Sequence, residues 1–176
     1  MEAERLIEAG RRALAGSRDV PAVMAEAWQA QVLARAVGGQ LARSGPAELR
    51  TEARELSDTG APAGTVPSHP MAAAGGVRAS QLSEVGDVSQ ALGALAQLLG
   101  EVGIALVGVA CVTDEEGLYW QCIEAIDAAD ESVDRVHGML RRFAEHEHER
   151  ERGPGEERDG PYGMARGPAD RAAGYP

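Results

Sequence analysis

The middle of the chain lacks basic side chains. Residues 84–134 contain 11 acidic residues and no arginine, lysine or histidine. Elsewhere the charges balance, with 8 acidic and 8 basic residues in 1–56, one of each in 57–83, and 8 of each in 135–176. The formal net charge of -11 therefore comes from this middle segment. Because nucleic acids and anionic lipids are bound through Lys and Arg, we expect no nucleic-acid partner.

Lysine and asparagine are absent altogether, and all 17 basic residues are arginine. Such a bias is typical of a GC-rich genome, so the abundance of Ala, Gly and Arg is weak support for any function. Aromatic residues make up only 3% of the chain. A core built from this sequence must therefore rely on close aliphatic, alanine and glycine contacts.

Motifs for catalysis and cofactor binding are also missing. The sequence has no nucleophile elbow, no phosphate-binding glycine loop and no dinucleotide fingerprint. Its two cysteines, Cys111 and Cys122, do not form a CxxC motif. We therefore predict no catalytic residue, no cofactor and no metal site, and an enzyme is the less favoured class.

Histidines occur close together only in AEHEHERER, residues 144–152. His146 and His148 are two positions apart and would point to different sides of a helix, whereas a zincin places its histidines at i and i+4. We interpret this segment as a charged helix end.

The strongest positive signal is a repeat of apolar residues every three or four positions, which is typical of helices that pack lengthwise. The first seam comprises Val85, Val88, Leu92, Leu95, Leu99, Val102, Leu106 and Val109. The second comprises Tyr119, Cys122, Ile126, Ala129, Val133, Val136, Leu140 and Phe143. Between them, Thr113 and Glu116 have the spacing of a capping box. The pattern predicts an antiparallel αα-hairpin over residues 81–150.

Small residues follow the first seam of this hairpin. Glycines inside a helix cost about 1 kcal/mol each relative to alanine, so a contact must offset them. We predict a surface on which another backbone approaches closely, with Gly86, Gly93, Ala96, Gly100 and Gly103 as interaction candidates. A buried β-strand over residues 103–112 is the alternative for the apolar end of this segment.

Acidic residues line the second arm opposite its seam, at Glu124, Asp127, Glu131 and Asp134. We interpret them as a solvated face, with a basic partner as the alternative.

The N-terminal residues 1–56 read as further helices of the same domain. Residues 2–16 are amphipathic, Asp19 is placed to cap a second helix that contains Trp28 as its large anchor, and Pro46 opens a third, short segment. Residues 57–80 read as a flexible Gly- and Pro-rich linker, and residues 151–176 as a disordered tail. The start of the chain lacks the pattern of a signal peptide, so we expect a cytoplasmic protein.

The run LLGEVGIALVGVACVTDEEGLYWQCIEAIDAADES, together with MAEAWQAQ near the start, resembles a family of uncharacterised all-α proteins from actinomycetes. The resemblance covers most of residues 1–150. It implies no activity, cofactor or site residue.

These observations predict an all-α bundle of about four helices, built on the hairpin. We expect it to act through protein–protein interaction, as a homo-oligomer or as a regulatory partner. One alternative is a small enzyme or ligand-binding bundle with a site near the hairpin turn, at Cys111, Tyr119, Trp120 and Cys122. A further alternative is a membrane-associated hairpin, which the absence of basic flanks disfavours.

Overall fold

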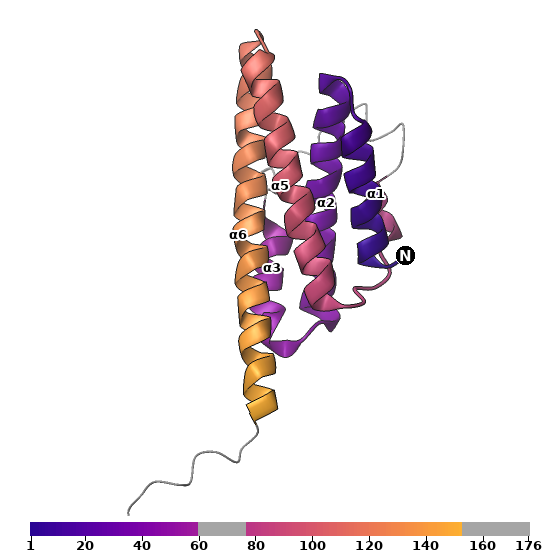
Figure 1. Ribbon diagram of the computed structural model, residues 1–176, viewed down its shortest axis with the longest axis vertical. Helices are drawn as coiled ribbons and strands as arrows, with labels where there is room; N and C mark the ends of the chain where they lie inside the picture. The colour runs from indigo at the N-terminus through magenta and orange to yellow at the C-terminus, as the bar shows by residue number, and fades with distance from the viewer. Residues whose placement is uncertain (60–76, 153–176) are drawn as a thin grey trace, which may run out of the picture.

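The computed structural model describes residues 1–59 and 77–152 (Figure 1). Within these ranges the chain is helical, and its one β-type contact is an isolated bridge between Glu2 and Glu84. The α-helices are α1 (Ala3–Gly16), α2 (Val20–Ser44), α3 (Arg50–Asp58), α5 (Val88–Val112) and α6 (Glu116–Arg152). Two 3₁₀-helices, η1 (Ala47–Leu49) and η2 (Arg78–Gln81), complete the described elements. The predicted all-α bundle is confirmed.

The N-terminal helices begin close to the predicted positions. Asp19 caps α2, since its Oδ1 accepts a hydrogen bond of 2.8 Å from the backbone N–H of Ala22. The short segment after Pro46 divides into η1 and α3. Its apolar face, Leu49, Ala53 and Leu56, is fully buried. Local capping and periodicity thus account for this half of the fold.

The hairpin consists of α5 and α6, which lie antiparallel along their shared length (Figure 1). Asp87 caps α5 by accepting a hydrogen bond of 2.8 Å from the N–H of Gln90. At the turn, the Thr113 hydroxyl accepts from the N–H of Glu115 at 3.2 Å, one residue earlier than the predicted capping box. Helix α5 continues to Val112, so the alternative of a β-strand over residues 103–112 is wrong.

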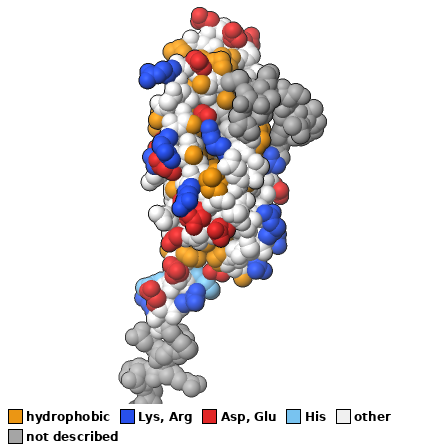
Figure 2. Space-filling view, turned by 90° about the vertical axis from the view of Figure 1, so that its right-hand side faces the viewer, with side chains coloured by type: hydrophobic (Ala, Val, Ile, Leu, Met, Phe, Trp, Pro, Cys, Tyr) orange, Lys and Arg blue, Asp and Glu red, His pale blue; other side chains and the backbone are white. Residues whose placement is uncertain are grey.

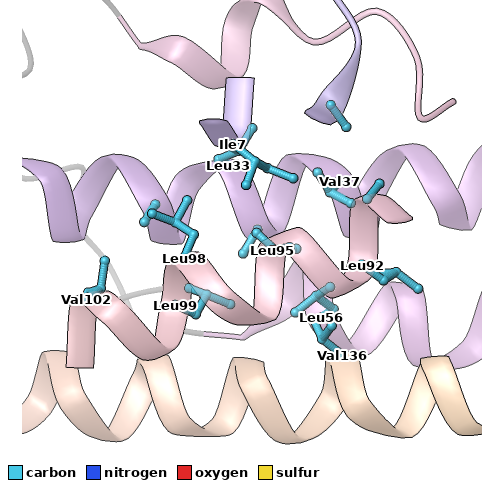
Figure 3. Close-up of a cluster of buried hydrophobic side chains, with 14 of the residues drawn as sticks. Ile7, Leu33, Val37, Leu56, Leu92, Leu95, Leu98, Leu99, Val102 and Val136 are labelled. Atoms are coloured by element: carbon cyan, nitrogen blue, oxygen red, sulfur yellow. The ribbon is translucent and has the colours of Figure 1, made fainter. Parts of the chain in front are cut away.

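Helix α5 forms the centre of the core (Figure 3). Ile7 and Leu33 lie on one side of it, and Leu56 and Val136 on the other (Figure 3). The first seam is confirmed over most of its length, with at most 6% of each side chain exposed at Leu92, Leu95, Leu99, Val102, Leu106 and Val109. Because α5 packs against α1, α2 and α6, one apolar helix is buried from several directions.

The second seam is buried except at its start. Cys122, Ala129 and Val136 are buried, and most of the remaining positions pack against the core. Tyr119 is 41% exposed, so its assignment to the core is wrong. It lies in the first turn of α6, where the hairpin extends beyond the ends of α1 and α2 (Figure 1).

Trp28 is a second correction, because it remains partly exposed and α2 contributes Leu33 to the core instead. Trp28 directly follows the buried Ala27 in the sequence, so the two side chains point in different directions around the helix. The small side chains of Ala27, Ala30 and Ala34 are buried on α2 together with Leu33, Val37 and Leu41.

The predicted linker over residues 57–80 is too long at both ends. Ser57 and Asp58 belong to α3, and η2 packs on α2. The Arg78 guanidinium donates to both carboxylate oxygens of Glu26, and its backbone N–H donates to Gln29 Oε1 at 3.1 Å. The remaining linker residues, 60–76, and the predicted tail from residue 153 onward lie outside the described residues.

Candidate interaction surface

One face of α5 is left uncovered by the other described helices. It is formed by side chains at a spacing of three or four residues, and we call it the α5 face: Ser89, Gly93, Gln97, Gly100, Ile104, Val107 and Cys111. Ile104 is 76% exposed and Val107 is 48% exposed. This face contains no charged residue. Its N-terminal half carries Ser89, two glycines and the polar Gln97, and its C-terminal half carries the large apolar side chains.

The predicted small-residue strip lies on or beside this face, but no described backbone approaches it closely. A Cβ added at Gly93 or Gly100 would meet no atom within 4 Å. At Gly86 and Gly103 the neighbours would be carboxylate groups, those of Glu4 at 3.5 Å and Asp130 at 3.9 Å. Ala96, the fifth candidate, is partly buried against the core. The contact expected to offset the glycines is therefore not made by α1, α2, α3 or α6.

Helix α1 neutralises the only charge on α5. Glu101 accepts two hydrogen bonds of 3.1 Å from Arg11 Nε, and Arg11 Nη2 donates to the same carboxylate. This ion pair raises the pKa of Arg11, chiefly through the hydrogen bond to Glu101. The ion pair between Arg11 and Glu101 therefore borders the α5 face on the side next to α1.

The opposite edge of the α5 face is formed by α6. Asp130 lies beside Gly103 and so fixes where α6 borders the face. Exposed residues along this border follow a spacing of three or four, and we call them the α6 edge: Asp127, Asp130, Asp134, His137 and Arg141. None of the five makes an ion pair with another described residue. The α6 edge is acidic toward the hairpin turn and basic toward the other end.

Further apolar side chains are exposed at the hairpin turn. Val112 is exposed, and the rings of Tyr119 and Trp120 make an edge-to-face contact with centroids 5.4 Å apart. Figure 2 shows hydrophobic side chains next to acidic ones at this upper end of the molecule. The acidic residues of the turn, Asp114–Glu116, keep this end hydrophilic despite its exposed aromatics.

The four residues of the alternative core site do not share one environment. Cys111, Tyr119 and Trp120 are exposed, whereas Cys122 is buried. Cys122 Sγ lies 3.8 Å from Met24 Sδ, and burial raises the pKa of the Cys122 thiol. Both cysteines are free thiols.

A shallow hollow of about 330 Å³ lies elsewhere, on α2. It is lined by Val32, Arg35, Ala36, Gly39, Gln40, Arg43, Ser57, Ala79 and Leu82. Arg35 Nε already donates to the Ser57 carbonyl at 3.1 Å. The hollow does not adjoin the hairpin turn.

Metal-ligating side chains do not gather anywhere in residues 1–59 and 77–152: no group of three His, Cys, Asp or Glu could hold an ion. His146 lies 3.7 Å from a Glu149 oxygen on the exposed end of α6. In the acidic stripe, Glu131 pairs with Arg135, while Glu124, Asp127 and Asp134 are exposed.

Helix α5 is long and apolar enough to cross a membrane by length and composition, with a mean hydropathy of 2.0 over its most apolar window. Within that window 44% of the residues are buried inside the bundle. The central helix of a bundle satisfies the same criteria, so this finding is weak support for a membrane protein.

The sequence reasoning missed the large apolar half of the α5 face. Ile104 and Val107 lie outside the first seam, within the apolar run of residues 103–112. Their spacing from Gly100 and Cys111 is again four, three and four, so a second periodic face was readable beside the first.

Comparison with known proteins gives a family but no function. A model of a family of unknown function, DUF6099, matches residues 1–142. No curated protein and no solved structure matches this chain significantly.

Proposed function

The chain belongs to the DUF6099 family, and because the function of that family is unknown, we propose one from the geometry: the protein binds protein through the α5 face. In this proposal the bundle is a rigid, non-enzymatic support that presents a hydrophobic helix face in the cytoplasm. The exposed Ile104 carries the proposal, because a large apolar side chain at 76% exposure lies in the middle of an uncharged helix face.

The borders of the face support binding of a protein rather than of an anionic surface. Arg11 pairs with Glu101 on one side, and carboxylates line the other side at Asp127, Asp130 and Asp134. A hydrophobic centre with a polar rim is the usual anatomy of a protein interface. Acidic side chains at the rim repel nucleic acids and anionic lipids.

A membrane-associated hairpin is the second candidate, because α5 has the length and hydropathy of a membrane-spanning helix. It would require α5 to leave α2 and α6, which bury its seam at Leu95, Leu99 and Leu106. It would also bring the acidic turn at Asp114–Glu116 to the lipid. Binding through the exposed face keeps the buried seam intact.

The test is native mass spectrometry of the protein purified gently from its own host, with Ile104→Asp as the probe. We expect a complex of fixed stoichiometry with the wild-type chain and its loss in Ile104→Asp. Thr51→Asp is the matched control, because Thr51 is exposed in the first turn of α3, where a carboxylate is tolerated. Equal circular dichroism spectra and melting midpoints would show that all three proteins share one fold.

Two outcomes would overturn the proposal. One is a wild-type monomer that carries a defined small molecule and no protein, which would favour a ligand-binding bundle. The other is a complex that survives Ile104→Asp unchanged. Flotation of the wild-type protein with zwitterionic vesicles, abolished by Ile104→Asp, would instead assign the same face to a membrane.

A further inference from the structure

We infer that the partner on the α5 face is a second copy of this chain, bound by antiparallel pairing of α5 with α5 about a two-fold axis. This inference rests on the proposed function and names its partner. Two independent features support it: the size pattern along the α5 face and the charge pattern along the α6 edge.

The order of large and small side chains along the α5 face is complementary to the same order read in the opposite direction, as in an antiparallel pair. When Gly100 of one copy lies opposite the partner's Gln97, Ile104 lies opposite the partner's Gly93 and Val107 opposite the partner's Gln90. The space around Gly93 is empty, since a Cβ there would meet nothing within 4 Å. A large exposed side chain of one copy thus fills a hole of the other, and the two-fold axis repeats the contact.

A parallel pair would not use this pattern. It would place Ile104 against the partner's Ile104 and Gly93 against the partner's Gly93. The large halves would then hold the small halves apart, and the cavity at the glycines would lose packing contacts. The size pattern therefore favours the antiparallel arrangement.

The charge pattern selects the same arrangement. A two-fold axis perpendicular to α5 brings the α6 edge of one copy to the α6 edge of the other. Helix α6 runs antiparallel to α5 with Asp130 beside Gly103, so Arg141 lies close to the level of Leu92. In the register defined by Gly100 and Gln97, Arg141 faces the partner's Asp127 and the partner's Asp130. His137 faces the partner's Asp130 and the partner's Asp134.

These are side chains that make no ion pair with the described residues of their own chain. The basic end of the α6 edge thus meets Asp127 and Asp130 of the second copy, while the two Asp134 residues lie near the two-fold axis. Opposite charges across a rim fix the register of an interface. Self-pairing also offsets the cost of the glycines in α5, because a glycine surface lets two helices approach closely.

The register is tested by cross-linking with a short bismaleimide. Gly100 lies near the two-fold axis, so Gly100→Cys in a Cys111→Ser background should cross-link to a covalent dimer. The native Cys111 is exposed, but in this register the two Cys111 residues are about 37 Å apart along α5, so the wild-type chain should not cross-link. Cross-linking through Cys111 would show parallel pairing and overturn the inference.

The charge pattern is tested by reversing the charge of single residues on the α6 edge. Asp130→Arg and Arg141→Asp should each weaken the dimer about tenfold in sedimentation equilibrium, and the double variant should recover most of that loss. Glu124→Arg is the control for Asp130→Arg, because it makes the same change in net charge at an exposed position that is not part of the α6 edge. Failure of the double variant to recover would overturn the proposed register.

The possible failures are distinguishable. A monomeric wild-type chain that still forms an Ile104-dependent complex with another protein would overturn the inference that the partner is a second copy. The proposed function would remain supported. A monomer that forms no Ile104-dependent complex would overturn both.

Discussion

The Arg11 guanidinium is hydrogen-bonded to the carboxylate of Glu101, with Arg11 Nε at 3.1 Å from both oxygens. Glu101 is the one charged residue within α5. The pair therefore ties α1 to the central helix and leaves the α5 face uncharged. A helix that would otherwise carry an isolated carboxylate beside its exposed apolar residues is neutral along its length.

Replacing Glu101 by Gln should lower the thermal midpoint slightly at low ionic strength, because Arg11 then loses a charged acceptor. The side chains of the pair are about one-third and two-fifths exposed, so salt should screen their attraction. The difference from the wild-type midpoint should shrink at about 1 M NaCl. A deficit that does not depend on salt would show that packing, not charge, makes Glu101 important.

Alanine at Gly93 or Gly100 should have opposite effects on the monomer and on the complex. In the monomer each substitution should stabilise α5 by about 1 kcal/mol, because the added Cβ meets open space and alanine is the better helix former. In the proposed dimer Gly93→Ala should weaken association, because the added methyl group occupies the space that would receive the partner's Ile104. Urea unfolding of dilute protein and sedimentation of concentrated protein measure the two effects separately. If Gly93→Ala is stabilising and leaves association unchanged, Gly93 is an ordinary surface position.

Much of the fold was readable from local patterns, because its signals are short-range. Asp19 marks a helix start in the sequence and caps that helix in the structure. The seam from Leu92 to Val109 predicted which side of α5 is buried. The exposed end of the hairpin was not predictable in the same way. Whether Tyr119 is covered depends on how far α1 and α2 reach along α5, and residue spacing does not encode that length.

The interaction surface shows the same limit. Periodicity located the small-residue strip, but tertiary packing decided that Ala96 is partly buried while Gly93 and Gly100 lack close neighbours. Similarly, η2 follows a Gly- and Pro-rich stretch, and contacts with distant residues such as the ion pair between Arg78 and Glu26 hold it on α2. Such long-range contacts are invisible in a local pattern.

The two thiols should differ strongly in reactivity. Cys111 is exposed and should react with iodoacetamide at neutral pH, whereas Cys122 is buried with a raised pKa and should react only on unfolding. Mass spectrometry of the partly alkylated protein would assign the sites. Fast modification of Cys122 in the folded protein would show that the core near Met24 opens readily.

The raised pKa of Cys122 also predicts how stability depends on pH. The thiol loses its proton more easily in the unfolded chain, where its pKa has the ordinary value of a cysteine, than in the core, where burial raises the pKa. The stabilisation it provides is therefore fully present below the pKa of the unfolded chain and is lost as the pH rises toward the folded value. Unfolding free energies measured from pH 7 to 10 should fall more steeply for the wild-type chain than for Cys122→Ala. Parallel curves would contradict this assignment.

Gly38 on α2 has no room for a side chain, because α3 packs against it. A Cβ at Gly38 would lie 2.8 Å from both the Ala53 carbonyl oxygen and the Ser57 backbone nitrogen, so α3 would have to move. We expect Gly38→Ala to destabilise the protein by about 1–3 kcal/mol, the usual range for overpacking.

Gly39 is the matched control, because a Cβ there would meet only the ends of the Arg43 and Ser57 side chains, at 3.3 and 3.4 Å. Since those side-chain ends can shift, Gly39→Ala should be close to neutral in urea unfolding. Equal losses in both variants would mean that the contact between α2 and α3 is looser than the Gly38 geometry requires. Loss confined to Gly38→Ala would identify this crossing, rather than the small-residue strip of α5, as the close backbone contact within the bundle.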